Sequence, residues 1–205
     1  MKKTLLILST ILVAFSGLSQ EPIRTRKVVQ VMPQQEMYLN GGIRSAFGGK
    51  SRVYYQITLP PNTVEWYYVV TTHPAEQHPS LNLLPQLTKL LDPTGTTAIL
   101  ASAIMTPTGS NTCDVYLMDR ANADAFIQKA DNNGGKYFHV VSANRENFRN
   151  GTVQINNIKQ GTWYLGFKNP SESQGIGISF EVAAIVEEVG YAVEQTKAIN
   201  YGNLG

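Results

Sequence analysis

Apolar and polar residues alternate over most of the chain from Arg52 onward, which is the pattern of strands that are buried on one face. In the run 52–59, one face collects Val53, Tyr55, Ile57 and Leu59. The same period of two predicts strands over 64–71, 113–118, 136–142, 152–158, 161–168 and 176–186, with a weaker edge strand over 27–32. Short alternating strands separated by Gly, Asn and Pro turns predict a mainly β fold, an antiparallel two-sheet sandwich of the jelly-roll kind.

Two adjacent prolines, Pro60 and Pro61, separate the first two main strands. Proline has no backbone N–H to give to a strand ladder, so the strand over 52–59 must end before them. The pattern resumes at Val64, with Trp66, Tyr68 and Val70 on the same face. The short connection suggests a hairpin between these two strands.

The segment 80–106 departs from the alternating pattern. Between Ser80 and Leu91 the leucines recur near helical spacing, and Ser80 is suited to cap the helix N-terminus. A second apolar run follows over 96–105. We therefore expect a short helical insertion at about 80–106, and a further short helix over 121–130.

The first residues have the pattern of a secretory signal peptide. Lys2 and Lys3 precede an apolar run over 4–15, and the small residue Ser19 predicts cleavage after it, with Gln20 as the alternative. This apolar run is shorter than the ~20 residues that cross a bilayer, and no later apolar run is longer. No cysteine lies near the predicted cleavage site, where a lipoprotein would carry its lipid. We expect an exported soluble protein, periplasmic or secreted and not a lipoprotein.

The expected organisation follows from these patterns. A signal peptide over 1–19 precedes an N-terminal segment over 20–51, which contains the weak edge strand. A single β-sandwich domain over 52–186 comes next, and a polar tail over 187–205 ends the chain.

The charge of the chain argues against a nucleic-acid partner, and its single cysteine argues against a disulfide. The formal net charge of +2 comes from 17 Lys and Arg against 15 Asp and Glu, and removal of Lys2 and Lys3 leaves 15 of each sign. A chain without a basic excess is a poor candidate for binding nucleic acid. The single cysteine, Cys113, cannot form an internal disulfide, and its place on the apolar face of the strand over 113–118 predicts a buried, unreactive thiol.

Two segments carry a resemblance to a known group of domains. Cys113-Asp-Val-Tyr-Leu-Met-Asp119 and the later Gly161-Thr-Trp-Tyr-Leu-Gly-Phe-Lys-Asn169 resemble core strands of GOLD-like and pre-peptidase C-terminal β-sandwich domains. The resemblance covers about residues 52–186, and the whole chain is similar to exported proteins of Gram-negative bacteria. It implies a binding or auxiliary module, in which structural positions are held by Gly161, Tyr164, Phe167 and Asn169.

Candidates for catalysis or metal binding are few. His73, Glu76 and His78 lie close together, but their spacing is not a recurring metal signature and the sequence offers no fourth ligand. No G-x-S-x-G nucleophile motif occurs, and Asp114 and Asp119 point to opposite faces of a regular strand. We predict no catalytic residue, no metal site and no cofactor.

Tyrosines offer the best binding hypothesis. They lie on the strand faces opposite the apolar ones, where rings can stack on sugars or contact a protein: Tyr54, Tyr67, Tyr116 and Tyr164. The alternative is that the insertion at 80–106 buries this face. A third interpretation leaves the insertion exposed as an apolar surface, formed by Leu81, Leu84, Leu87 and Ile104.

The sequence thus favours a non-catalytic module of the cell envelope that binds a protein or carbohydrate partner or serves a structural role. One alternative is an envelope hydrolase whose site lies under the insertion at 80–106. Another is a lipid-binding or self-assembling protein that uses the insertion itself. An oligomer is compatible with each of these hypotheses.

Overall fold

The computed structural model describes residues 22–91, 101–129 and 141–191 of the chain. The predicted signal peptide, residues 92–100 of the insertion, residues 136–140 of one predicted strand and the end of the tail lie outside these ranges. In chain order the helices, strands and 3-10 turns are β1 Ile23–Leu39, α1 Gly42–Ala46, β2 Arg52–Thr58, β3 Thr63–His73, α2 Leu83–Leu90, η1 Ala101–Ala103, β4 Cys113–Met118, α3 Arg120–Ile127, η2 Val141–Ala143, β5 Arg145–Phe148, β6 Asn150–Ile155, β7 Thr162–Lys168 and β8 Ile176–Gly190.

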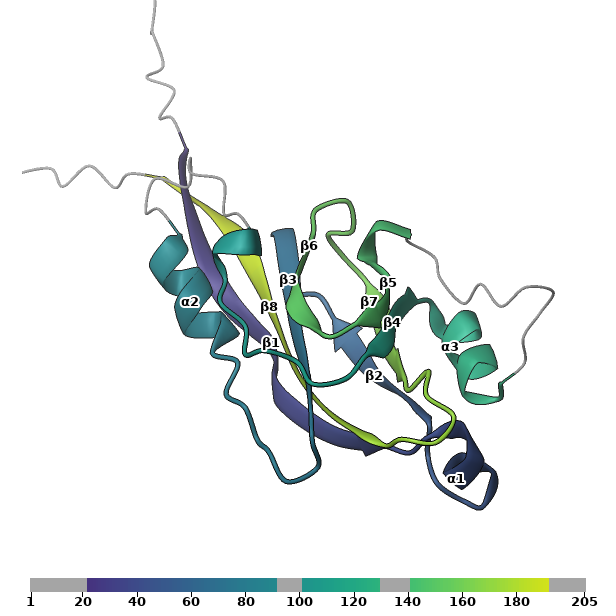
Figure 1. Cartoon of the computed structure of the whole chain (residues 1–205). Helices are drawn as coiled ribbons and strands as arrows, with labels where there is room; N and C mark the ends of the chain where they lie inside the picture. The colour runs from purple at the N-terminus through teal and green to yellow at the C-terminus, as the bar shows by residue number, and fades with distance from the viewer. Residues whose placement is uncertain (1–21, 92–100, 130–140, 192–205) are drawn as a thin grey trace, which may run out of the picture.

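The described strands form two antiparallel four-stranded sheets that pack against each other (Figure 1). Sheet A has the strand order β1-β8-β3-β6, and sheet B has the order β2-β7-β4-β5. The chain crosses from one sheet to the other at most of its connections, and the two orders together are those of a jelly roll. The predicted mainly β sandwich with a short helical insertion is therefore confirmed.

The apolar faces of the two sheets meet in one core. Phe167 of sheet B and Phe180 of sheet A have ring centroids 4.6 Å apart, and the ring of Tyr55 lies 4.8 Å from that of Phe180. The inward residues predicted from the alternation in 52–59 belong to this core or pack against it, as do Leu165 and Phe167 of β7 and Ile176, Ile178, Phe180 and Val182 of β8. The period of two therefore identified the buried face of each of these strands.

The predicted hairpin between the first two main strands is wrong. β2 pairs with β7 in sheet B, whereas β3 pairs with β6 and β8 in sheet A. The two prolines give the turn no N–H groups for a hairpin ladder, and the turn is held instead by β8, where Glu187 N donates to Asn62 O at 3.0 Å. An irregularity between Thr63 and Glu65 then turns Val64 to the outer face of sheet A, away from Trp66.

Strand boundaries differ most where the strand ladder is irregular. β1 is far longer than the predicted strand over 27–32 and pairs with β8 along most of its length. Register shifts between Gln30 and Met32, and between Met32 and Gln35, break the period of two that would have revealed it. The strand predicted over 152–158 is β6, and the described end of the strand predicted over 136–142 is the 3-10 turn η2.

The insertion covers the outer face of sheet A (Figure 1). Leu81, Leu83 and Leu87 are buried and pack with Tyr67 and Ile185 of the sheet. α2 begins at Leu83 and not near Ser80, so Pro85 falls in its first turns, where proline is tolerated.

A carboxylate from sheet A replaces the predicted N-cap of α2. Asn82, with φ of 54°, precedes the helix and makes no side-chain capping bond. The buried side chain of Glu181 on β8 accepts instead from Leu83 N at 2.8 Å and from Leu84 N at 3.3 Å. This bond joins the helix N-terminus to the sheet that the helix covers.

α3 covers the outer face of sheet B and buries Ala123 and Phe126 against it. Its N-cap is Asp119, whose carboxylate accepts from Asn122 N at 2.8 Å. Over the described ranges, none of the helices has both the length and the apolar character needed to cross a membrane.

Candidate functional site

The four predicted binding tyrosines do not share one surface. Tyr54, Tyr116 and Tyr164 gather on the outer face of sheet B under α3, whereas Tyr67 lies on sheet A under the insertion. Tyr67 is fully buried, and Tyr116 and Tyr164 are 6% and 7% exposed. Most of their ring area is therefore packed inside the protein, and Tyr54 is the member of the group that lines a pocket.

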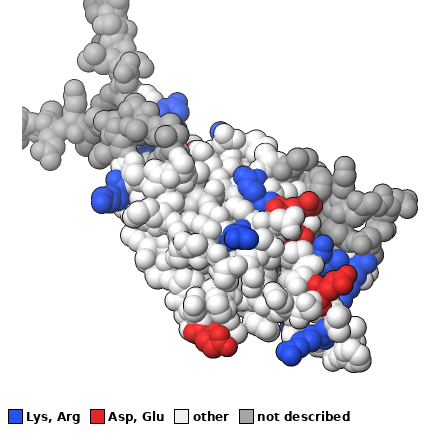
Figure 2. Space-filling model, in the orientation of Figure 1, with Lys and Arg blue, Asp and Glu red and all other residues white. Residues whose placement is uncertain are grey.

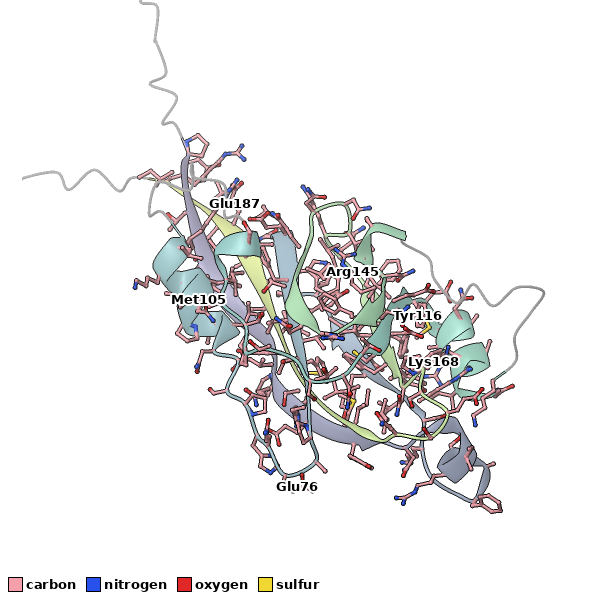
Figure 3. The ribbon with its side chains drawn as sticks, in the orientation of Figure 1. Glu76, Met105, Tyr116, Arg145, Lys168 and Glu187 are labelled. Carbon is pink, nitrogen blue, oxygen red and sulfur yellow. The ribbon has the colours of Figure 1, made fainter. Side chains whose placement is uncertain are left out.

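Aromatic and cationic side chains fix α3 on sheet B. The rings of Tyr54 and Tyr164 meet edge to face at 5.4 Å, and the Arg120 guanidinium lies 5.6 Å from the centre of the Tyr164 ring. Arg52 of β2 lies over the Phe126 ring at 5.4 Å and donates to Phe126 O at 3.1 Å. Figure 3 shows Tyr116 and Lys168 beside α3, on the same side of the sheet.

A pocket of about 410 Å³ opens where the start of β2 meets the C-terminal end of α3. We call it the edge pocket, and its lining consists of Gly49, Lys50, Ser51, Arg52, Val53, Tyr54, Ile127 and Lys129. Six of these residues are consecutive, and the last three, Arg52, Val53 and Tyr54, are the first residues of β2.

The edge pocket is cationic. Its lining includes Lys50, Arg52 and Lys129, and no Asp or Glu is among these lining residues. Lys50 and Lys129 are exposed, and Lys129 Nζ lies 3.3 Å from Ser45 Oγ of α1. Figure 2 shows Lys and Arg side chains together with Asp and Glu side chains toward the end of the molecule where α1 and α3 lie. The pocket is thus suited to an anionic group.

β2 is an edge strand of sheet B. Hydrogen bonds at its two ends show which of its residues bond to β7 and which face the open edge. Asn169 N donates to Ser51 O, and Leu59 N donates to Gly161 O. In an antiparallel pair such residues alternate, so the odd-numbered residues of β2 bond to β7 and the even-numbered ones direct their N–H and C=O to the open edge. The main-chain N–H and C=O groups of Tyr54, Gln56 and Thr58 therefore point to the open edge of the sheet.

The other sheet edges are less regular or are flanked. β1 carries two register shifts and Pro33, and β5 is four residues long with an irregular pairing to β4. Beside β6, Asn150 accepts from Gly109 N at 3.1 Å and donates to Thr106 at 3.0 Å, so the segment around 106–109 runs along that strand. β2 pairs with β7 without a register shift. The chain after β1 is joined to the residue before β2, where Asn40 N donates to Lys50 O at 2.8 Å, and beyond that point the β2 edge is the best template for an added strand among these four.

The insertion does not form an exposed apolar surface in the described residues. Leu81, Leu87 and Ile104 are buried, and Leu84 is half-buried. The three buried side chains of the insertion therefore pack against its own sheet, whereas Met105 is 79% exposed.

The histidines and acids considered as chemical groups have structural partners. His73 bonds to Pro74 O and Ser179 Oγ, and His78 Nδ1 lies 2.5 Å from Glu36 Oε2, a contact that lowers the pKa of that carboxyl. Asp114 is paired with Lys168 at 3.3 Å. Over the described residues, no group of three or more His, Cys, Asp or Glu side chains is arranged to hold a metal.

Cys113 is fully buried in the core, as the sequence predicted. Burial, with a smaller contribution from Asp114, raises the pKa of its thiol from 9.0 to about 12. Such a thiol is not a nucleophile at neutral pH.

We expect this buried thiol to make the protein less stable in alkali. The unfolded thiol titrates near 9.0 and the folded one near 12, so its contribution is complete below pH 9 and is lost as pH rises toward 12. From this difference, the free energy of unfolding should fall by about 1 kcal/mol between pH 9 and pH 10. Urea titrations of the wild type and Cys113→Ala at these two pH values measure it. An equal loss in both proteins would contradict the prediction.

The positions implied by the resemblance have structural roles here. Gly161 has φ of +95° at the turn into β7, a conformation that favours glycine. Asn169 is buried and donates to Leu39 O at 3.2 Å and to Gln174 O at 2.7 Å, which closes the turn after β7. Comparison of the chain with protein-family models and with curated proteins finds no match.

Sequence reasoning missed Lys50, Ile127 and Lys129, which line the edge pocket. Lys50 lies just before the first main strand and Lys129 near the end of the helix predicted over 121–130, so each looks like an ordinary solvated residue at the end of an element. They come together because α3 docks on sheet B beside its edge strand. No local spacing in the sequence encodes that docking.

Proposed function

We propose that the protein is a non-catalytic binding module of the cell envelope, and that its edge pocket holds an anionic group of a protein or carbohydrate partner. The observation that carries the proposal is a pocket with Lys50, Arg52 and Lys129 in its lining and no carboxylate among the lining residues. Arg52 also anchors the C-terminal end of α3, so the two lysines are the cations left to face a ligand. Exposed cations beside a concave surface attract anions and orient them.

The proposed location rests on the N-terminal pattern. Lys2 and Lys3, followed by the apolar run over 4–15, are typical of an exported chain. The resemblance to β-sandwich modules of exported proteins supports the same class of function, and fold alone does not identify the ligand.

Charge reversal in the edge pocket should abolish most of the binding to an anionic polymer. We would measure fluorescence anisotropy of two labelled probes, poly-L-glutamate and polygalacturonate, with the chain from Gln20 onward. The Lys50→Glu, Lys129→Glu double variant should bind at least about tenfold more weakly, since each reversal replaces an attraction by a repulsion.

A matched control keeps the same change of net charge. Lys89 of α2 and Lys159 before β7 are exposed and lie outside the edge pocket, so the Lys89→Glu, Lys159→Glu variant should stay within about threefold of the wild type. Equal weakening in both double variants would overturn the proposal, as would failure of the wild type to bind either probe.

A further inference from the structure

We infer that the partner is an extended peptide segment with acidic residues at alternate positions, which adds to sheet B as an antiparallel strand along β2. The inference rests on the proposed function and deepens it. The edge pocket includes Arg52, Val53 and Tyr54 at the start of an edge strand, so a ligand that extends from the pocket along β2 meets main-chain N–H and C=O groups as well as the lysines. Strand addition uses both kinds of contact.

The parity of β2 determines the pattern of the peptide. Tyr54 and Gln56 direct their N–H and C=O groups to the open edge, and their side chains lie on the α3 face of sheet B. In an antiparallel ladder, residues that exchange both hydrogen bonds have side chains on the same face. Each peptide residue that bonds to β2 therefore also directs its side chain to the α3 face.

Charge complementarity then makes those residues acidic. Lys50 and Lys129 line the edge pocket at the α3 end of β2, and they match carboxylates on that face of the added strand. The intervening residues of the peptide lie on the opposite face, level with the half-buried side chains of Val53 and Tyr55 at the rim of the core. Apolar residues are suited to that position.

A capped octapeptide of alternating Glu and Val is the probe that tests this geometry. Methylation of every Glu backbone nitrogen removes the N–H groups that face β2, whereas methylation of every Val nitrogen removes those that face solvent. Loss of two or more main-chain hydrogen bonds should weaken the N-methyl-Glu peptide at least about tenfold. The N-methyl-Val peptide should bind within about threefold of the parent peptide in calorimetric titrations.

A variant of the protein tests the same edge from the other side. Gln56→Pro removes an outward N–H and leaves the β2–β7 bonds of the odd-numbered residues in place, so it should weaken the parent peptide about tenfold. Gln56→Ala keeps the N–H and should bind as the wild type does. Thermal unfolding of both variants shows whether they are folded. The experiment with the methylated peptides uses the wild-type protein and does not depend on these variants.

The remaining outcomes distinguish a failure of strand addition from a failure of the proposed anion site. If the N-methyl-Glu peptide keeps the parent affinity while Lys50→Glu, Lys129→Glu abolishes binding, strand addition is overturned and the anion site stands. Binding of polygalacturonate at the pocket without binding of the octapeptide would overturn the inference in favour of a carbohydrate. A dimer in light scattering that Gln56→Pro dissociates would overturn it in favour of a second copy on β2.

Discussion

Replacing Phe180 by alanine should lower the free energy of unfolding by about 3–5 kcal/mol, which is a large part of the stability of a typical domain. Phe180 is fully buried between the sheets, where its ring meets Phe167 at 4.6 Å and Tyr55 at 4.8 Å. Truncation leaves a cavity that strands of both sheets line, and paired strands collapse into such a space only partly. Urea unfolding monitored by circular dichroism measures the change.

Phe47 provides a control of the same chemistry. Its side chain is 89% exposed at the end of α1, so Phe47→Ala should change the free energy of unfolding by less than about 0.5 kcal/mol. If Phe180→Ala proves too unstable to purify, Phe180→Leu keeps most of the volume and should cost about 1.5 kcal/mol or less. Similar losses for Phe180→Ala and Phe47→Ala would contradict the packing of the two sheets on one core.

Replacing Glu181 by alanine should cost about 2–3 kcal/mol and loosen α2 from sheet A. The Glu181 carboxylate accepts from Leu83 N, Leu84 N and the Gln30 amide, and it is buried. Its removal leaves the first N–H groups of α2 without an acceptor, and hydrogen bonds to a charged group are worth about 1.5–3 kcal/mol each. Glu181→Gln retains a carbonyl oxygen and should recover part of the loss.

Glu188, on the same strand, is the matched control for this substitution. Its side chain is 58% exposed and pairs with Lys27 at the surface, so Glu188→Ala should cost no more than about 1 kcal/mol. Hydrogen exchange on the α2 amides should accelerate in Glu181→Ala and stay unchanged in Glu188→Ala. Unchanged α2 protection in Glu181→Ala would show that the carboxylate does not hold the helix.

The regular strands of the fold could be predicted from the sequence, whereas the start of α2 could not. The alternation in β2, β7 and β8 identified the inward side chains, because one-sided burial imposes a period of two on every regular strand. The start of α2 could not be predicted this way, since its capping group comes from Glu181, 98 positions from Leu83. β1 was predicted too short because its bulges interrupt the alternation of apolar and polar residues.

The candidate site shows a similar division. Alternation placed the four tyrosines on strand faces opposite the core, where they do lie, but it treated them as one surface, although Tyr67 is in sheet A and the other three are in sheet B. Sheet membership depends on which strands pair, and the turn through Pro60 and Pro61 gave no local sign of the crossing. The cations of the edge pocket likewise become neighbours only when α3 docks.

Hydrogen exchange along β2 tests the central claim most directly, because it reports on the edge that the partner is inferred to occupy. In the free protein the amides of Tyr54 and Gln56 should exchange fast, and the amide of Tyr55, bonded to β7, should be protected. Addition of the Glu-Val octapeptide at saturation should slow Tyr54 and Gln56 at least about tenfold and leave Tyr55 nearly unchanged. Unchanged exchange at Tyr54 and Gln56 under saturating peptide would contradict strand addition at this edge.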